Sequence, residues 1–177
     1  MTIEINATHD AAATSWVESA NGDTDFPLQN LPFGVFRSAA APARGGVALG
    51  DRIIDLTALL ETGLLSGDAV AAAQAASGDT VLPLLGAAPV ALSALRAQLF
   101  ALFASDSPHR AALAPVLVAM ADAELLMPLK PPAFTDFCTS YDHIARMGGG
   151  GVPKLAALSL PVAYNGRASS VRASGAP

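Results

Sequence analysis

The sequence predicts an α+β, mostly β fold, and three features of the chain support this class. Residues 45–56 form two short β-rich runs around a turn dipeptide. Residues 68–104 carry Ala-rich and helix-periodic segments, and from residue 125 onward prolines and glycines divide the chain into short extended pieces. A length of 177 residues suffices for one ordinary domain, or for a small domain and the start of a second. We expect a β-containing domain with a helical insert, followed by an incomplete second domain.

The first predicted element is a hairpin in the text GGVALGDRIIDL, residues 45–56. The dipeptide Gly50-Asp51 supplies the central residues of a tight turn between two strands. A short helix is expected next, from Thr57 to Thr62. Thr57 can cap its start, and Gly63 can end it in the left-handed conformation.

Two longer helices are predicted in the middle of the chain. Ala-rich composition favours one over Asp68–Ala76, and helical spacing of apolar residues indicates another over Pro89–Ala104. The apolar residues at helical spacing are Leu92, Leu95, Leu99, Leu102 and Phe103. Ser107 is suited to cap a further short helix with Pro108 in its first position, and Pro115 ends that segment.

The composition along the chain suggests three regions. Residues 1–24 are polar and Ala-rich without a period, so we expect a loosely held lead-in, with order beginning near Asp25. The change of character near residue 121 predicts a domain boundary there. The resulting regions are 1–24, 25–120 and 121–177.

Charge and composition disfavour several function classes. The net charge is −5, and Lys and Arg do not cluster, which argues against a nucleic-acid partner. Ser93, Arg96 and Gln98 interrupt the longest apolar runs, so no membrane association is expected. The N-terminus lacks the pattern of a secretory signal, and a cytoplasmic location is the default expectation. Cys138 is the single cysteine, which excludes an internal disulfide and a Cys-based zinc cluster.

Three segments, in order, resemble one known family. These are DFPLQNLPFGVF with the RGGVALGDRIIDL hairpin, then AFTDFCTSYDHIARMG, and finally LPVAYNGRASSVRASGAP. Together they resemble the front part of fumarylacetoacetases, from about Asp25 to Pro177. The resemblance implies a small SH3-like β-barrel over residues 25–120, then the truncated start of a mixed β-roll catalytic domain.

The resemblance also implies an activity, a cofactor and partners. Family members hydrolyse a carbon–carbon bond of a β-diketone in tyrosine and phenylalanine breakdown, giving fumarate and acetoacetate. They act as homodimers with a divalent cation, Ca²⁺ or Mg²⁺, on a small diketo acid substrate. For this chain, the resemblance implies an N-terminal fragment whose remaining metal ligands lie beyond residue 177.

The reaction needs a base to activate water and positive charge on the carbonyl oxygens. By resemblance, Asp136 is a metal-binding carboxylate and His143 is the base, a role suited to an imidazole of near-neutral pKa. If the intervening stretch were helical, these side chains would share one face about 10 Å apart, too far to ligate one ion together. The alternatives without a catalytic role are a helix cap or solvated turn for Asp136 and a surface helix residue for His143.

Two further residues match substrate-contacting positions. Tyr164 matches a tyrosine that contacts substrate, with a buried sheet tyrosine as the alternative. Cys138 stands where the family commonly has another such tyrosine, which makes it a doubtful substrate contact, and no base is placed near it for thiol catalysis. Arg167 and the Ser169-Ser170 pair are expected to satisfy backbone groups in a turn.

The chain also departs from the family pattern. The family's Glu-x-Glu pair and a further aspartate are missing, and Gly148–Gly151 replaces a loop that carries a basic side chain. The chain alone is therefore expected to be inactive. Two other readings remain open: a truncated, non-catalytic binding or dimerisation module, and a related acylpyruvate-type hydrolase.

Overall fold

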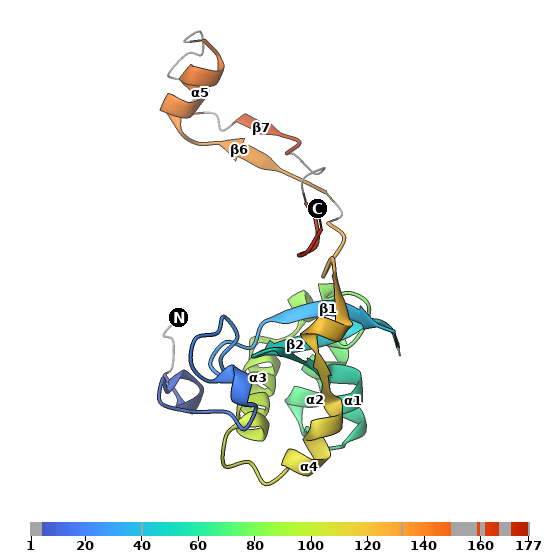
Figure 1. Ribbon diagram of the computed structural model, residues 1–177. Helices are drawn as coiled ribbons and strands as arrows, with labels where there is room; N and C mark the ends of the chain where they lie inside the picture. Colours follow the sequence, from blue (N-terminus) through green and yellow to red (C-terminus); the bar gives the residue numbers. More distant parts are fainter. Residues whose placement is uncertain are drawn as a thin grey trace. The chain divides into compact units, whose positions relative to one another are not determined.

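The computed structural model describes residues 5–39, 41–131, 133–149, 159, 162–166 and 171–176 (Figure 1). The chain divides into two compact units. Unit 1 contains Met1–Leu129 together with Ala173–Pro177, and unit 2 contains Lys130–Arg172. Among the helices of the described residues, none combines the length and apolarity needed to cross a bilayer.

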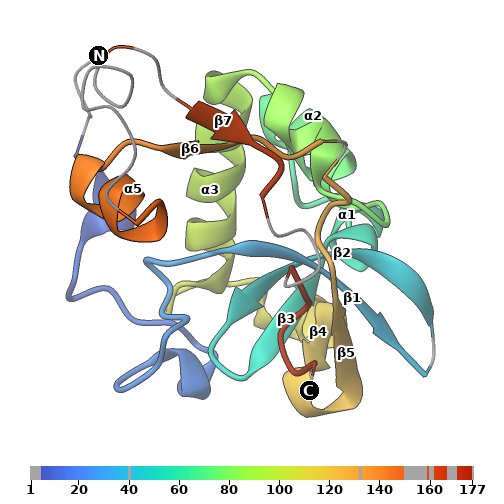
Figure 2. The ribbon, with the colours of Figure 1, turned by 90° about the horizontal axis from the view of Figure 1, so that it is seen from above.

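Unit 1 is built on a curled, antiparallel, five-stranded sheet that forms a half-barrel (Figures 1 and 2). Its strands are β1 (Phe33–Ser38), β2 (Ala41–Leu49), β3 (Arg52–Asp55), β4 (Leu117–Ala119) and β5 (Ala123–Leu126), in the order β4-β3-β2-β1-β5. The predicted hairpin is confirmed as β2 and β3. Its turn at Gly50 has a φ of +58°, a conformation that glycine adopts without steric cost.

The predicted helical insert lies between β3 and β4. It contains α1 (Leu56–Glu61), α2 (Asp68–Ala76), α3 (Pro89–Phe103) and α4 (Arg110–Leu113). The prediction for α2 is confirmed at both ends, and α3 ends one residue earlier than predicted. Gly63 follows α1 with a φ of +67°, as expected of a residue that ends a helix.

Two predicted helix caps are wrong. Asp55, not Thr57, caps α1, because its carboxylate accepts hydrogen bonds from the backbone N–H groups of both Thr57 and Ala58. The hydroxyl of Ser107 accepts from the backbone N–H of His109 and so closes a local turn, and α4 begins only after that turn. Asp55 thus directly precedes α1 as its cap, whereas α4 begins three residues after Ser107 without a side-chain cap.

Small side chains let α2 approach its neighbours closely. Four alanines of α2, Ala69, Ala72, Ala73 and Ala76, are fully buried, and α2 packs against α3. These helices close over the apolar face of the sheet, and one buried cluster joins Val47 and Ile54 of the strands to Leu95 of α3. The alanine-rich text thus reflects close helix packing rather than an exposed helix.

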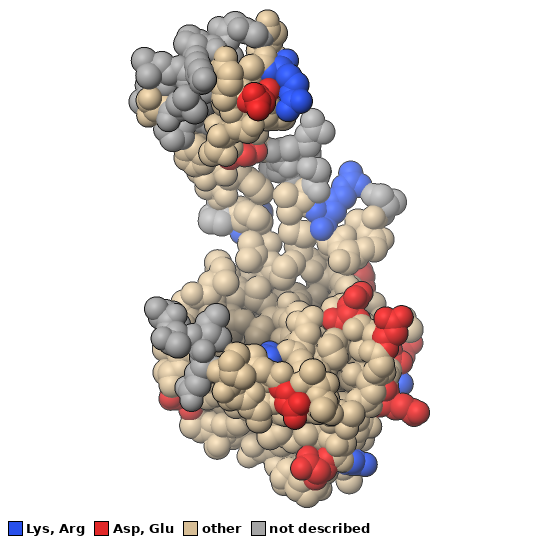
Figure 3. Space-filling model, turned by 90° about the vertical axis from the view of Figure 1, so that its left-hand side faces the viewer, with Lys and Arg blue, Asp and Glu red and all other residues tan. Residues whose placement is uncertain are grey.

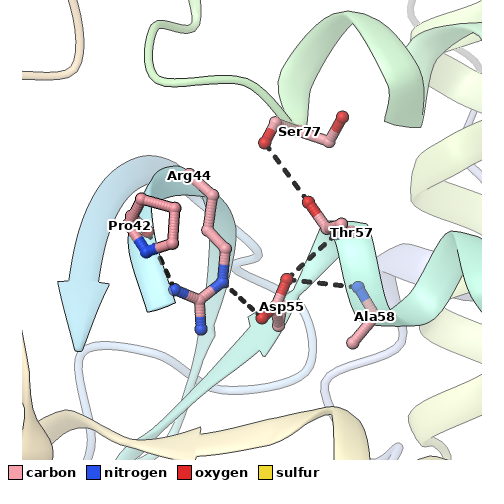
Figure 4. Close-up of polar contacts among 6 residues, drawn as sticks. All are labelled: Pro42, Arg44, Asp55, Thr57, Ala58 and Ser77. Carbon is pink, nitrogen blue, oxygen red and sulfur yellow. Dashed lines mark hydrogen bonds and ion pairs between the residues drawn. The ribbon is translucent and has the colours of Figure 1, made fainter. Parts of the chain in front are cut away.

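A partly buried ion pair joins β2, β3 and α1 (Figure 4). The Nε atom of Arg44 lies 2.5 Å from Oδ2 of Asp55, and the two side chains expose only 13% and 10% of their surface. The Arg44 guanidinium also lies over the ring of Phe36, 4.4 Å from its centroid. Because the other carboxylate oxygen caps α1, Asp55 fixes the helix to the sheet as well as pairing with the arginine.

The described part of the N-terminal segment, residues 5–24, packs against the rest of unit 1, whereas a loosely held lead-in was expected for residues 1–24. Trp16 stacks on Phe103 with ring centroids 5.5 Å apart. The last carbonyls of α3 accept hydrogen bonds from the indole N–H of Trp16 and the hydroxyl of Ser15. The segment thus satisfies groups that a helix end leaves open, a tertiary role that local composition does not reveal.

Arg96 of α3 anchors the N-terminal segment at a second point. Its guanidinium donates to the hydroxyl and carbonyl of Thr8 and to the carbonyl of Gln29. Unit 1 also extends past the boundary expected near residue 121, since β5 pairs with β1 and completes the sheet. The physical reason is strand pairing, which crosses the change of composition.

Candidate functional site

The candidate site lies in unit 2, on a two-stranded antiparallel ribbon. Strand β6 spans Asp136–Cys138, and β7 spans Val162–Tyr164. Asp136 stands directly opposite Tyr164 in the register. Since directly opposed residues project to the same face, the ribbon places the carboxylate and the phenol side by side. Cys138, two residues along β6, projects to that face too.

Hydrogen bonding toward the Asp136 carboxylate, followed by desolvation and the charges of Asp136 and Cys138, raises the pKa of Tyr164 to about 12. The neutral phenol is favoured because ionisation would place a second negative charge beside the carboxylate. Tyr164 is 48% exposed, so the alternative of a buried sheet tyrosine is wrong.

The backbone at Gly166 lies near the Asp136 side chain. A Cβ atom added at Gly166 would lie 3.3 Å from Cβ and 3.4 Å from Oδ2 of Asp136. The first of these distances is tighter than most side-chain contacts, so the absent side chain leaves the carboxylate its space. The sequence-based prediction of a turn in this segment did not reveal the contact. Gly166 lies two residues after Tyr164, and this spacing is the signal that could have revealed the contact with Asp136.

His143 belongs to a different element of unit 2. It lies on α5 (Tyr141–Met147), which Ser140 caps by accepting a hydrogen bond from the backbone N–H of His143. Ile144 is buried, whereas the His143 side chain is exposed. The supposition of one helix through Asp136 and His143 is wrong, because Asp136 is on a strand. Among the described contacts, none joins the imidazole to the Asp136–Tyr164 pair.

The described part of the chain does not by itself form a cation site. Hard cations such as Ca²⁺ bind six to eight oxygen ligands in proteins. No group of three or more His, Cys, Asp or Glu side chains suited to a metal occurs among the described residues. The described part of the ribbon contributes one carboxylate, that of Asp136.

Some predicted features fall outside the described residues. Arg167, Ser169 and Ser170 lie there, as does the second half of Gly148–Gly151. Of the first half, Gly148 donates its backbone N–H to the carbonyl of Ile144, and Gly149 has a φ of +61°. These two glycines therefore end α5.

Unit 1 has a separate open hollow of about 600 Å³. It is lined by Trp16, Val17, Glu18, Ser19, Asp51, Arg52, Ala114 and Leu117. A hydrogen bond from the Ser19 hydroxyl, followed by the charge of Arg52, lowers the pKa of Asp51. The face of the molecule in Figure 3 shows scattered carboxylates on a largely uncharged surface of unit 1.

Comparison with known proteins identifies the family. Residues 29–128, more than half of the chain, match the family model described as Fumarylacetoacetase N-terminal. The chain belongs to the fumarylacetoacetase family. The match covers the half-barrel and its helical insert, and it ends two residues past β5.

Curated fumarylacetoacetases are similar to the chain beyond the matched domain as well. The protein of Oryza sativa subsp. japonica is 38% identical over 174 residues, which cover 91% of this chain and 40% of the relative. The protein of Mus musculus is 34% identical and that of Caenorhabditis elegans 36%, each over 166 residues and 39% of the relative. The chain thus spans about 40% of the length of these fumarylacetoacetases.

Proposed function

We propose that the chain is the N-terminal portion of a hydrolase that cleaves fumarylacetoacetate to fumarate and acetoacetate in tyrosine and phenylalanine catabolism. Similarity to fumarylacetoacetases across both units supports the proposal. The structural observation that carries it is the β6–β7 register. That register sets Asp136 opposite Tyr164, and the resemblance implies a functional role for both.

Each candidate residue has a distinct role in the proposed reaction. His143 removes a proton from water, whose oxygen bonds to a carbonyl carbon of the β-diketone. The bond between that carbon and the central carbon then breaks. Its electron pair leaves as the acetoacetate enolate, which takes up a proton. Tyr164 contacts the diketo acid, and Cys138 offers only a weak thiol donor where a phenol would serve better.

The proposed cofactor is Ca²⁺ or Mg²⁺, with Asp136 as one ligand. The other ligands are proposed to come from the part of the hydrolase that the relatives have and this chain does not span. When bound, such a cation polarises the substrate oxygens. We further propose a cytoplasmic homodimer, an SH3-like barrel for unit 1, and a β-roll for the domain that begins in unit 2.

Hydrolysis by the protein isolated from its source tests the proposal, with fumarate and acetoacetate quantified as products. We expect His143→Gln to reduce kcat by about 10²- to 10⁴-fold. His109→Gln serves as the matched control, because His109 lies in unit 1 outside the motifs, and it should retain full activity. Hydrolysis of acylpyruvates alone would favour the related hydrolase. No hydrolysis of either substrate class would leave the binding or dimerisation module as the explanation.

A further inference from the structure

We propose that Ser140 is a positioning residue for His143: it holds the first turn of α5 in place and thereby sets where the proposed base stands. The inference rests on the proposed function, because only there does His143 remove a proton from water. It gives Ser140 a task in the reaction without any contact with substrate. The supporting observations are the hydrogen bonds at the start of α5.

Both oxygens of Ser140 accept hydrogen bonds from consecutive backbone N–H groups of α5. Its hydroxyl oxygen lies 3.4 Å from the backbone nitrogen of His143, and its carbonyl oxygen lies 3.0 Å from that of Ile144. The first N–H groups of a helix have no partner within the helix itself. The amide of His143 is one of these groups, and the Ser140 hydroxyl is its partner. The backbone of the proposed base is therefore tied directly to Ser140.

Ser140 also lies at the junction of the two elements that carry the proposed metal ligand and the proposed base. Strand β6 begins with Asp136 and ends at Cys138, and α5 begins at Tyr141. Ser140 keeps an extended backbone, with a φ of −102° and a ψ of 116°, so the helix starts directly after it. Its two hydrogen bonds thus determine where the chain turns from the strand of the carboxylate into the helix of the base.

The first turn of α5 has few other contacts to hold it. The helix is seven residues long, and helices of that length are marginal in water without tertiary support. Ile144 is its buried side chain, whereas Asp142 and His143 are exposed. Loss of the cap would leave the His143 amide to water and let the turn open. Because a base must stay within hydrogen-bond reach of the water it activates, such an opening lowers the rate of the chemical step.

Backbone hydrogen exchange, measured by NMR on the 177-residue chain, tests the contact without any enzymatic activity. We expect Ser140→Ala to speed exchange of the His143 amide by about 5- to 30-fold, the factor that corresponds to loss of a helix cap. Ser140→Thr keeps a capping hydroxyl and should restore most of the protection. An exchange rate at His143 that Ser140→Ala leaves unchanged would overturn the inference.

Thr139→Ala is the matched control for the exchange measurement. Thr139 is the neighbouring hydroxyl residue and is exposed like Ser140. Among the described residues, no hydrogen bond involves its hydroxyl group. The Thr139→Ala chain should therefore exchange the His143 amide at the original rate. Acceleration equal to that of Ser140→Ala would show that the cap does not hold the turn, and it would also overturn the inference.

Kinetics of the complete hydrolase separate positioning from helix stability. Ser140→Ala should lower kcat by about 5- to 30-fold with KM retained, and Ser140→Thr should recover most of it. Gly149→Ala loosens α5 at its other end, because Gly149 has a φ of +61°, and it should cost less of kcat. Equal losses of kcat in the Ser140→Ala and Gly149→Ala enzymes would refute a positioning role.

The two measurements also distinguish this inference from the proposed function. A change in KM alone for Ser140→Ala would refute the positioning role while leaving the hydrolase intact. Hydrolysis that is absent even from the unsubstituted protein would refute the proposed function and not the capping contact, which hydrogen exchange at His143 tests separately.

Discussion

At the scale of single residues, the pKa of the Tyr164 phenol reports its interaction with Asp136 and can be measured by titration. Asp136→Asn removes the charge that holds the phenol neutral, so the pKa of Tyr164 should fall from about 12 toward 10.0. Absorbance titration in a Tyr141→Phe background isolates this phenol. Asp142→Asn, on α5 of the same unit, should leave the titration unchanged. A pKa that stays near 12 in the Asp136→Asn chain would refute the contact.

The raised pKa of Tyr164 also makes the stability of the ribbon depend on pH. The folded pKa lies above the ordinary value of 10.0, so the contact stabilises the ribbon fully below pH 10. The contribution is lost as the pH rises from there through about 12. Hydrogen exchange at β6 and β7 should therefore accelerate in that window beyond the base-catalysed rate. The Tyr164→Phe chain should lack the extra acceleration.

Asp55 combines two roles that a single substitution removes. Asp55→Ala deletes the cap of α1 and leaves Arg44 without its partner in a partly buried place. Loss of a cap costs about 1 kcal/mol, and breaking a buried pair costs about 3–5 kcal/mol. Since the pair keeps some exposure, we expect about 3 kcal/mol from urea unfolding. Asp68→Ala, in the exposed first turn of α2, should cost less than about 1 kcal/mol. Equal losses of unfolding free energy in the Asp55→Ala and Asp68→Ala chains would contradict a stabilising role for the ion pair.

At the scale of elements, the N-terminal segment should behave as part of the core. Trp16→Ala removes the stack on Phe103 and the indole hydrogen bond at the end of α3. Because Trp16 is half-buried, we expect a loss of about 2–3 kcal/mol in the free energy of unfolding. Trp16→Phe keeps the stacking and should cost about 1 kcal/mol. A negligible change in the free energy of unfolding for Trp16→Ala would mean that the N-terminal segment is a loosely held lead-in after all.

Two strand glycines should respond differently to alanine. A Cβ atom at Gly45 of β2 would fall 1.6 Å from the carbonyl oxygen of Ala76, so Gly45→Ala must displace α2 from the sheet. A Cβ at Gly34 of β1 meets nothing within 4 Å. We expect Gly45→Ala to destabilise unit 1 by about 3 kcal/mol, and Gly34→Ala to change stability by less than 1 kcal/mol. Thermal unfolding followed by circular dichroism compares them, and similar midpoints would contradict the close approach.

Local signals predicted the elements that depend on local chemistry. Turn residues predicted the turn at Gly50, and Ala-rich composition predicted the helix over Asp68–Ala76. The conformational freedom of glycine predicted the end of α1 at Gly63. The packing of Trp16 on α3 and the pairing of β5 with β1 depend on residues far apart in the chain. Periodicity carries no information about such partners. For that reason the lead-in and the boundary near residue 121 differed from the structure.

For the candidate site, the sequence supplied candidate residues but not their arrangement in space. The motif text singled out Asp136, His143, Tyr164 and Cys138 by resemblance. The antiparallel register that opposes Asp136 to Tyr164 joins segments more than 20 residues apart, and the sequence between them does not determine it. The helical spacing argument fails for the same reason, because Asp136 is the first residue of β6 and α5 begins only after the Ser140 cap.

At the scale of the whole molecule, the two units differ in how much core they possess. The buried apolar cluster lies in unit 1, drawn from the N-terminal segment, the sheet and the helices. The described part of unit 2 contributes Ile144 as its buried apolar side chain. Burial of apolar surface is the main source of stability, so unit 1 supplies most of it. This imbalance agrees with the proposal that unit 2 begins a larger catalytic domain.

The intact mass of the protein isolated from its source tests the central claim most directly. The chain has a mass of 17.8 kDa and spans about 40% of the length of the fumarylacetoacetases it matches. A hydrolase of this family should therefore show a mass more than twice that of the chain. A mass of 17.8 kDa would contradict the hydrolase proposal, because among the described residues Asp136 belongs to no group of three or more His, Cys, Asp or Glu side chains that could hold a cation.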